Sequence, residues 1–433
     1  MRKIYTNKSG FWDELSRLRA PFEPLALWIS SKDKILTVEN IIEQVYKRGD
    51  KALCEFTEKF DNVKLSSDNL RISKDEIAEA YDKTDETVRN SIQIAIDNVK
   101  VYQQHIKVYQ QEAIKREGVE LRTWYQPLNR VGVCVPGASA PLPSTVIMSA
   151  VPAIVAGVKE VVVMSPPRFE GSIHPLILAC CCMLGIKEVY RIGGAQGVAG
   201  LAIGTNSIKC VDKIVGPGNI YVQIAKKLLF GVVDIDSFAG PSEIVVLADE
   251  NANPKFVAVD LLGQAEHDPG SGILVTDSEK LAFSVEREIE NLLSDLPRAQ
   301  QIKKCLDEYG AIIIADTPEL AIDIVNRLAP EHLSVQTDDV DRTLSRCVAS
   351  GAIFAGHYTS EAVGDYVAGP SHVLPTGGTA RFFSPLNVMD FIRHTSVIKY
   401  DKQALEKVYP VIKDFTEAEQ LLAHQKSASV RLE

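Results

Sequence analysis

The chain has 433 residues, of which 45% are hydrophobic and 24% charged, so it is long enough to fill more than one hydrophobic core. Its net charge is −10 and its basic residues are scattered, which argues against nucleic acid as a partner, because that needs a concentrated cationic surface. The polar N-terminus lacks a signal-peptide core, and prolines interrupt the uncharged segment 131–158. From these features we expect a soluble, cytoplasmic protein with no membrane contact. The eight cysteines show no C-x-x-C spacing, so we expect reduced thiols.

The N-terminal part, through about residue 120, has the pattern of amphipathic helices. Within 74–111, apolar residues such as Ile77, Ala80, Val88 and Ile92 recur at spacings of three, four and seven. This pattern predicts a helical layer that covers another part of the protein.

The middle of the chain alternates short β-branched runs with helix-like segments. The predicted strands are 130–135, 161–164, 188–192 and 213–215, and the predicted helices between them are 144–157, 174–184 and 196–202. A second set follows, with strands 243–248, 272–276, 311–315 and 352–355 and a helix over 254–266. Alternation of this kind predicts two α/β units, each a parallel sheet wound with helices.

The tail, residues 401–425, is helical in pattern but has little core of its own. Such a segment is more easily explained if it packs on another body, for example a partner subunit.

Two short clusters carry side chains suited to chemistry. Gln264 and His267 stand three apart near the end of the predicted helix 254–266, so they share a face and could bind one ion, although polar residues at a helix end often bond only water. Glu331 and His332 are adjacent, and neighbouring side chains diverge on a helix or strand, which indicates separate roles. A surface helix start with an N-terminal acid is the alternative.

Loops supply further candidates. The segment 364–380 is rich in glycine and proline and carries Asp365 and His372, which fits either a functional loop or a connector. The tail adds Glu419 and His424, for which solvation is the default. Glycines at 193–197 and 216–218 follow predicted strands without a full G-x-G-x-x-G motif, so tight turns explain them as well as a dinucleotide site does.

Taken in order, these segments resemble the histidinol dehydrogenase family along nearly the whole chain. The blocks that carry the resemblance are 130–137, 193–196, 211–219, 239–243, 264–267, 330–332, 364–366, 371–376 and His424. The resemblance implies two incomplete Rossmann-like, doubly wound α/β domains with small helical N-terminal and C-terminal segments. It places 30–133 with 242–386 in a catalytic domain, 134–241 in an NAD-binding domain, and 1–29 with 387–433 in an arm for dimerisation.

The resemblance also implies a cofactor set of NAD and one Zn²⁺ per subunit. Gln264, His267 and Asp365 match the zinc ligands, with His424 donated by the other subunit of a homodimer. Two imidazoles, a carboxylate and a neutral oxygen are chemically suitable for zinc. The substrate-binding positions implied are Ser242, Gln264, His267, His332, Asp365, His372, Glu419 and His424.

The implied reaction is the oxidation of L-histidinol to L-histidine through L-histidinal, in two NAD-dependent steps, as the last step of histidine biosynthesis. His332 would remove the hydroxyl proton as hydride leaves, and Glu331 would activate the water that hydrates the aldehyde. Gln196, Asn219 and Cys134 match the family's NAD contacts.

This sequence departs from the family at two positions. Cys134 stands where a tyrosine often packs on NAD, and Ala138 stands where a second glycine is common. A catalytic thiol at Cys134 is an alternative. For the protein as a whole, the alternatives are a dehydrogenase of another alcohol, such as a sulfonated propanediol, or a non-catalytic metal- or nucleotide-binding scaffold.

Overall fold

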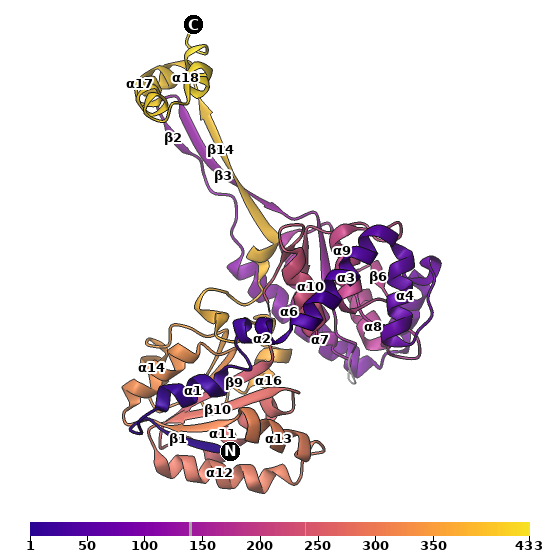
Figure 1. Ribbon diagram of the computed structural model, residues 1–433, viewed down its shortest axis with the longest axis vertical. Coiled ribbons are helices and arrows are strands. Elements are labelled where there is room, and N and C mark those ends of the chain that lie inside the picture. The colour runs from indigo at the N-terminus through magenta and orange to yellow at the C-terminus, as the bar shows by residue number, and fades with distance from the viewer. Residues whose placement is uncertain (138–140, 239) are drawn as a thin grey trace.

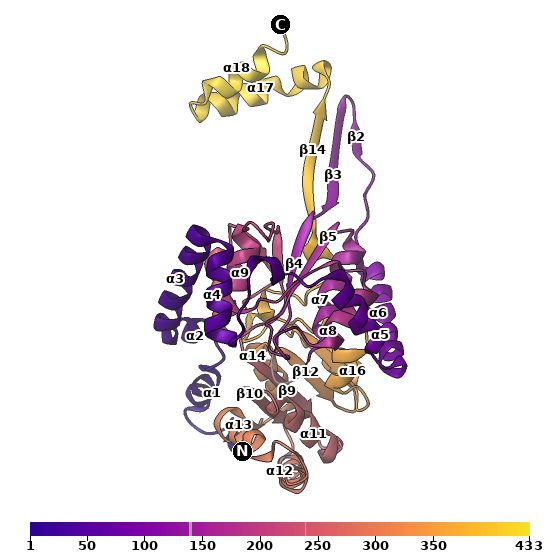
Figure 2. The ribbon, with the colours of Figure 1, turned by 90° about the vertical axis from the view of Figure 1, so that its right-hand side faces the viewer.

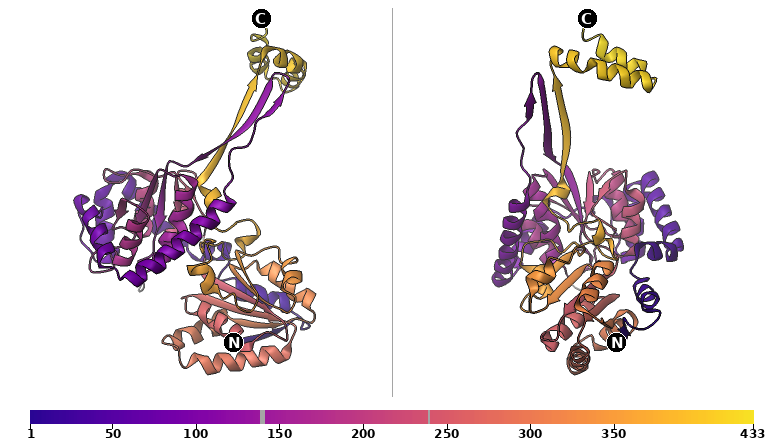
Figure 3. Two further views of the ribbon diagram at one scale, coloured as in Figure 1. Left: turned by 180° about the vertical axis from the view of Figure 1, so that it is seen from behind. Right: turned by 90° about the vertical axis from the view of Figure 1, so that its left-hand side faces the viewer.

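The computed structural model describes residues 1–137, 141–238 and 240–433, and β-sheets organise them into two α/β units and a projecting arm (Figure 1). Both larger sheets contain only parallel strands, and helices lie on their faces. The predicted α/β fold class is therefore confirmed. The two units lie side by side and the arm leaves one of them (Figure 3).

The six-stranded sheet forms the core of the first unit. Its order is β1 (Arg2–Tyr5), β11 (Ala311–Ile314), β10 (Gly270–Thr276), β9 (Ser242–Ala248), β12 (His332–Gln336) and β13 (Ala352–Ala355). One face packs on α11 (Pro254–Ala265), α12 (Glu279–Leu293) and α13 (Ala299–Tyr309), and the other on α1 (Phe11–Arg19) and α14 (Pro318–Leu328). Burial on both faces explains why strands such as β11 and most of β9 are apolar.

The five-stranded sheet forms the core of the second unit. Its order is β6 (Glu188–Tyr190), β5 (Glu160–Met164), β4 (Arg130–Cys134), β7 (Lys213–Val215) and β8 (Asp234–Ile235). The crossover helices are α7 (Pro143–Ala156), α8 (Pro175–Met183), α9 (Gly194–Ile203) and α10 (Ile220–Leu229). Within the uncharged segment 131–158, residues 131–134 belong to the buried strand β4 and residues 143–156 form the buried helix α7, in agreement with the expectation that this segment is no membrane span.

The N-terminal helices form the expected helical layer, but they cover the five-stranded sheet. Helices α3 (Lys32–Arg48) and α4 (Asp50–Asp61) contact α9, while α5 (Lys74–Lys83) contacts α8 and α6 (Glu86–Ile106) contacts α7. This packing differs from the predicted grouping of 30–133 with 242–386. The first residues also differ from the prediction, since β1 extends the six-stranded sheet. The amphipathic pattern shows that a helix has a buried face without showing which sheet buries it.

The arm is a long antiparallel ribbon. Strand β14 (Ile392–Tyr400) pairs along its whole length with β3 (Val119–Pro127), which also pairs with β2 (Ile114–Arg116). Helices α17 (Lys402–Ala418) and α18 (Leu422–Ser429) lie at the far end of this ribbon (Figure 2). Apolar side chains there, including Phe415 and Leu422, are exposed.

The remaining helices are short. They are α2 (Pro24–Ser30), α15 (Val340–Leu344) and α16 (Glu361–Tyr366), with 3-10 turns η1 (Ser67–Asn69), η2 (Thr379–Arg381) and η3 (Val388–Phe391). Within the described ranges, no helix combines the length and the apolar character needed to cross a bilayer.

Candidate active site

The predicted catalytic residues meet at the amino-terminal edge of the six-stranded sheet. Ser242 is the first residue of β9 and His332 is the first residue of β12, and these two strands are hydrogen-bonded neighbours. Gln264 lies in the last turn of α11, which returns to the same edge before β10. Helix α16, which carries Asp365, follows β13 and completes the cluster.

Glu331 is held by hydrogen bonds in a buried position just before β12. Its carboxylate accepts the hydroxyl of Ser242 (2.7 Å) and the backbone N–H of Glu243 (3.0 Å). Burial raises the pKa of Glu331 to about 8, although these two hydrogen bonds act in the opposite direction. A carboxylate with a pKa near neutrality accepts a proton much more readily than an ordinary glutamate does.

His332 is buried and oriented by the backbone. Its Nδ1 lies 3.1 Å from the carbonyl oxygen of Glu243. Because a carbonyl only accepts, this contact places a proton on Nδ1 and leaves Nε2 as the basic nitrogen. The expected divergence of Glu331 and His332 is wrong, since Nδ1 is 3.6 Å from Oε2 of Glu331. Glu331 precedes the strand, so the alternation of side chains along a strand does not apply to it.

An ion pair behind the cluster supports this geometry. The guanidinium of Arg19, from α1, pairs with the carboxylate of Glu243, and their side chains are 8% and 1% exposed. The other oxygen of Glu243 accepts the backbone N–H of Gly377 (3.0 Å). The N-terminal helix and the loop that follows α16 are therefore both fastened to the strand that carries Ser242.

Loss of this ion pair is expected to destabilise the fold. Replacement of Arg19 by Met leaves the buried Glu243 charge without a partner, which should lower the free energy of unfolding by about 3–5 kcal/mol. Chemical denaturation measures this change. Arg346→Met is the matched control, because Arg346 pairs at 3.4 Å with Glu319 and both side chains are over a third exposed, so its loss should cost at most about 1 kcal/mol. Equal losses in the two variants would contradict the buried pair's importance.

Three potential metal ligands, His332 among them, converge at this edge of the sheet. One ligand atom each from His332, Glu361 and Asp365 lies within 4.8 Å of the other two. Glu361 and Asp365 are four residues apart on α16, so their side chains share one face of that helix. Sequence reasoning missed Glu361 because its motif began at residue 364. The i, i+4 acidic spacing was the signal available.

The amide of Gln264 tests whether this cluster suits a cation. If its nitrogen faces α16, it donates to both oxygens of Glu361 and to Nδ1 of His332, each at 3.1 Å, and its oxygen accepts from Ser242 at 2.8 Å. Nδ1 already carries the proton that the Glu243 carbonyl requires, so it cannot accept another. A divalent cation bound to the amide oxygen would stabilise the other orientation, in which that oxygen faces Nδ1 and the Glu361 carboxylate. The residues present therefore fit a divalent metal.

Two further histidines lie near the acidic face of α16. Loss of solvent lowers the pKa values of His267 and His372, while the charge of Asp365 acts on both in the opposite direction.

The loop after α16 contacts the second unit, since Ser371 donates to the carbonyl of Met148 in α7 (3.0 Å). The cluster thus lies on the side of the first unit that faces the second.

The predicted NAD contacts lie in the five-stranded unit. Cys134 ends β4, Gln196 is buried in α9, and Asn219 caps α10 by accepting the backbone N–H of Tyr221 (3.0 Å). Gly216 adopts a φ of 101° against the Cys134 carbonyl, which is the tight turn that the sequence left open. Ala138 lies outside the described residues.

Cys134 is poorly suited to act as a nucleophile. Burial raises the pKa of its thiol to about 12, which keeps it protonated near neutral pH. The cysteines at 180 and 181 are likewise buried in α8. These surroundings disfavour the alternative in which Cys134 forms a covalent intermediate.

The tail residues lie far from the cluster within this chain. Glu419 ends α17 and His424 is in α18, and both are exposed. Figures 1 and 2 place these helices at the tip of the arm, at the opposite end of the molecule from the six-stranded sheet. One chain alone therefore does not bring His424 to Gln264 and Asp365.

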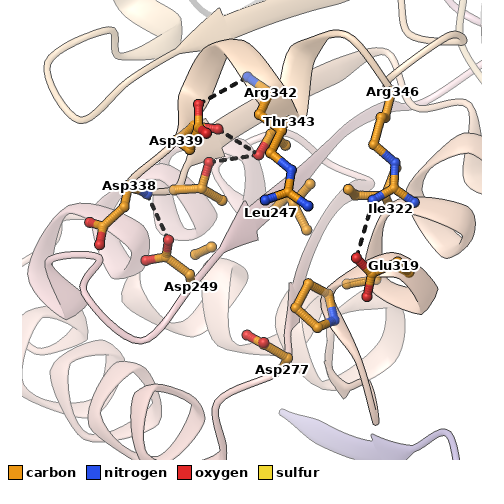
Figure 4. Close-up of a pocket in the computed structure, with 14 residues that line it drawn as sticks. Leu247, Asp249, Asp277, Glu319, Ile322, Asp338, Asp339, Arg342, Thr343 and Arg346 are labelled. Carbon is orange, nitrogen blue, oxygen red and sulfur yellow. Dashed lines mark hydrogen bonds and ion pairs between the residues drawn. The ribbon is translucent and has the colours of Figure 1, made fainter.

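A separate crevice of about 270 Å³ lies at the other, carboxyl-terminal edge of the six-stranded sheet (Figure 4). Its acidic side chains hold loops together: Asp249 accepts the backbone N–H of Asp338 (2.7 Å), and Asp339 accepts that of Arg342 (3.1 Å). None of the residues singled out in the sequence lines this crevice. The candidate active site is thus at the edge opposite to the one that open α/β sheets usually employ.

Comparison with known proteins agrees with this arrangement. A family model for histidinol dehydrogenase matches residues 29–432. The chain belongs to the histidinol dehydrogenase family. A histidinol dehydrogenase from Rhodopirellula baltica is 43% identical to it over 97% of this chain and 94% of the relative, and one from Geobacillus kaustophilus is 48% identical over 92% and 93%.

Solved structures agree as well. The crystal structure of histidinol dehydrogenase from Elizabethkingia anophelis covers 100% of this chain and 98% of its own, with a TM-score of 0.92 and 35% identity. The family resemblance noted in the sequence is confirmed, and as a member of the histidinol dehydrogenase family the chain is an oxidoreductase.

Proposed function

We propose that this protein oxidises L-histidinol to L-histidine through L-histidinal, with two molecules of NAD and at a zinc site, as the last step of histidine biosynthesis. The observation that carries the proposal is the buried Glu331–His332 pair beside the oxygen-rich group of Gln264, Glu361 and Asp365. Family membership supports the substrate, because the relatives compared above are histidinol dehydrogenases.

His332 serves as the base in both oxidations. Its Nδ1 is committed to the Glu243 carbonyl, so Nε2 is free to remove the hydroxyl proton of histidinol as hydride passes to NAD. After Nε2 has released that first proton to solvent, it removes a hydroxyl proton from the hydrated aldehyde while a second NAD accepts hydride. The fixed ring orientation serves both steps without rearrangement.

Glu331 activates the water that converts the aldehyde to its hydrate. Its raised pKa suits it to accept a proton near neutral pH, and the Ser242 hydroxyl and Glu243 N–H keep it in place. Because Glu331 adjoins His332, the hydrate forms where the base removes the next proton.

Zinc would be held by Gln264, His267 and Asp365, with His424 of a second subunit. When bound, it supplies positive charge that holds and orients the nitrogen atoms of the substrate. Ser242 and His372 would line the substrate pocket, together with Glu419 of that second subunit. Gln196, Asn219 and the backbone near Cys134 would contact NAD at the carboxyl-terminal edge of the five-stranded sheet, where nucleotides bind in such folds.

A homodimer would bring the tail to the site. The exposed apolar surface of α17 and α18 at the tip of the arm supports contact with another copy, and His424 and Glu419 would reach the cluster of that copy.

Mixing two inactive variants tests this arrangement. His332→Asn and His424→Ala are each expected to be inactive, whereas dimers re-formed from an equal mixture should recover about a quarter of wild-type activity, because half of them are mixed and keep one intact site. NADH production measures the recovery. A mixture of His332→Asn with Glu331→Gln is the control and should stay inactive, since every site then has a defect. Failure of the first mixture to recover would contradict exchange of the tails.

A stoichiometric assay tests the function itself. One histidinol should yield two NADH and one histidine. Activity on other alcohols, such as a sulfonated propanediol, with none on histidinol, would overturn the proposed substrate, and an inactive protein that still binds metal or NAD would indicate a scaffold.

A further inference from the structure

Glu361 is a carboxylate near the catalytic base that is not among the four proposed zinc ligands. Its side chain is 15% exposed, and its Oε1 lies 3.6 Å from Nδ1 of His332. Among the residues that the structure describes, His332 is its single ion-pair partner. A carboxylate oxygen of Asp365, which has the same charge, lies within 4.8 Å of it. A charge this poorly compensated favours a ligand that donates hydrogen bonds to it.

Orientation of the catalytic histidine does not explain Glu361. The Nδ1 proton of His332 is directed to the Glu243 carbonyl at 3.1 Å, while the 3.6 Å separation from Glu361 is beyond hydrogen-bond length. Capping does not explain it either, since Glu361 is the first residue of α16 and the described N-cap is Ser360. The carboxylate is therefore free to meet a group that lies next to the reacting centre.

We propose that Glu361 accepts hydrogen bonds from the amine of the substrate and so makes the site selective for 2-amino alcohols. This inference rests on the proposed function. The amine and hydroxyl of histidinol are on adjacent carbons, so a hydroxyl placed at the His332 imidazole puts the amine close to that ring. Glu361 is the carboxylate beside the ring that no hydrogen bond to Ser242 or backbone N–H already occupies. An amine donates N–H bonds whether it is protonated or bound to a metal.

The test pairs a side-chain change with a substrate change. Wild type, Glu361→Gln and the control Glu319→Gln, which makes the same change at an exposed site on α14, are assayed with L-histidinol and with 4-(3-hydroxypropyl)imidazole, which lacks only the amine. Glu361→Gln should raise KM for histidinol by about 10- to 100-fold, the loss expected for a charged hydrogen bond. KM for the amine-free alcohol should change less than about twofold. Glu361→Asp, which keeps the charge, should fall between wild type and Glu361→Gln.

Zinc content and thermal unfolding of each variant separate this role from others. Unchanged zinc with the substrate-dependent KM shift supports the inference. Equal KM shifts for both alcohols, loss of zinc from Glu361→Gln, or no shift at all would overturn it while histidinol oxidation by the wild type still stands. Wild-type protein that oxidises other alcohols but not histidinol would instead overturn the proposed function, and this inference with it. If Glu361→Gln does not fold, the Glu361→Asp comparison of the two alcohols decides by the same criterion.

Discussion

Replacement of His332 by Asn is expected to lower kcat for histidinol by about 10³-fold, because the reaction then lacks the general base that both oxidations require. The side-chain N–H of Asn can take the place of the Nδ1 proton and donate to the Glu243 carbonyl, so the fold should survive. Steady-state NADH formation measures the loss, and atomic absorption measures zinc, which should remain bound.

His105→Asn is the matched control for this variant. His105 is exposed near the end of α6, remote from the six-stranded sheet, so the same chemical change there should leave kcat unaltered. Near-normal turnover in His332→Asn would remove His332 as the base. Loss of zinc together with activity would instead assign the histidine to the metal.

Removal of the divalent cation with a chelator is expected to abolish histidinol oxidation, and added Zn²⁺ should restore it. The reason is that the proposed ligands, Gln264 and Asp365 among them, then hold no positive charge that could bind and orient the substrate. Mg²⁺ should restore little activity, since imidazole ligands suit zinc better than magnesium. NADH formation is measured before chelation, after it and after each addition.

Circular dichroism of the metal-free protein provides the control for chelation. The buried cores of both sheets do not involve the metal cluster, so secondary structure should persist. Full activity of protein shown to be free of metal would contradict the metal site. Unfolding on chelation would show a structural metal instead.

Much of the fold follows from local patterns in the chain. The apolar run 244–248 supported the predicted strand 243–248, and the corresponding strand β9 lies between two helical layers. The helical layer over 74–111 was equally readable from its periodicity. The surface on which this layer packs could not be predicted, because an apolar face of a helix can pack on many surfaces. Its packing on α7 and α8 depends on contacts between segments distant in the sequence.

The candidate site divides in the same way. Gln264, His332 and Asp365 were named from family motifs, and the structure brings all three to one sheet edge. Glu361 was missed, and the closeness of Glu331 to His332 was predicted wrongly, because both depend on where β12 and α16 begin. A shift of one or two residues in such a boundary changes which side chains face each other.

The amino-acid sequence by itself was enough to predict the parallel α/β class, the family and the motif residues. Hydrophobic periodicity and short motifs lie within short stretches of the chain, so they can be recognised without the tertiary structure. The tertiary structure decided which sheet the N-terminal helices cover, which edge holds the chemistry, and that the tail with His424 projects away from its own cluster. Those outcomes depend on contacts between segments that are distant in the sequence, and a local pattern does not show which distant segment a side chain will meet.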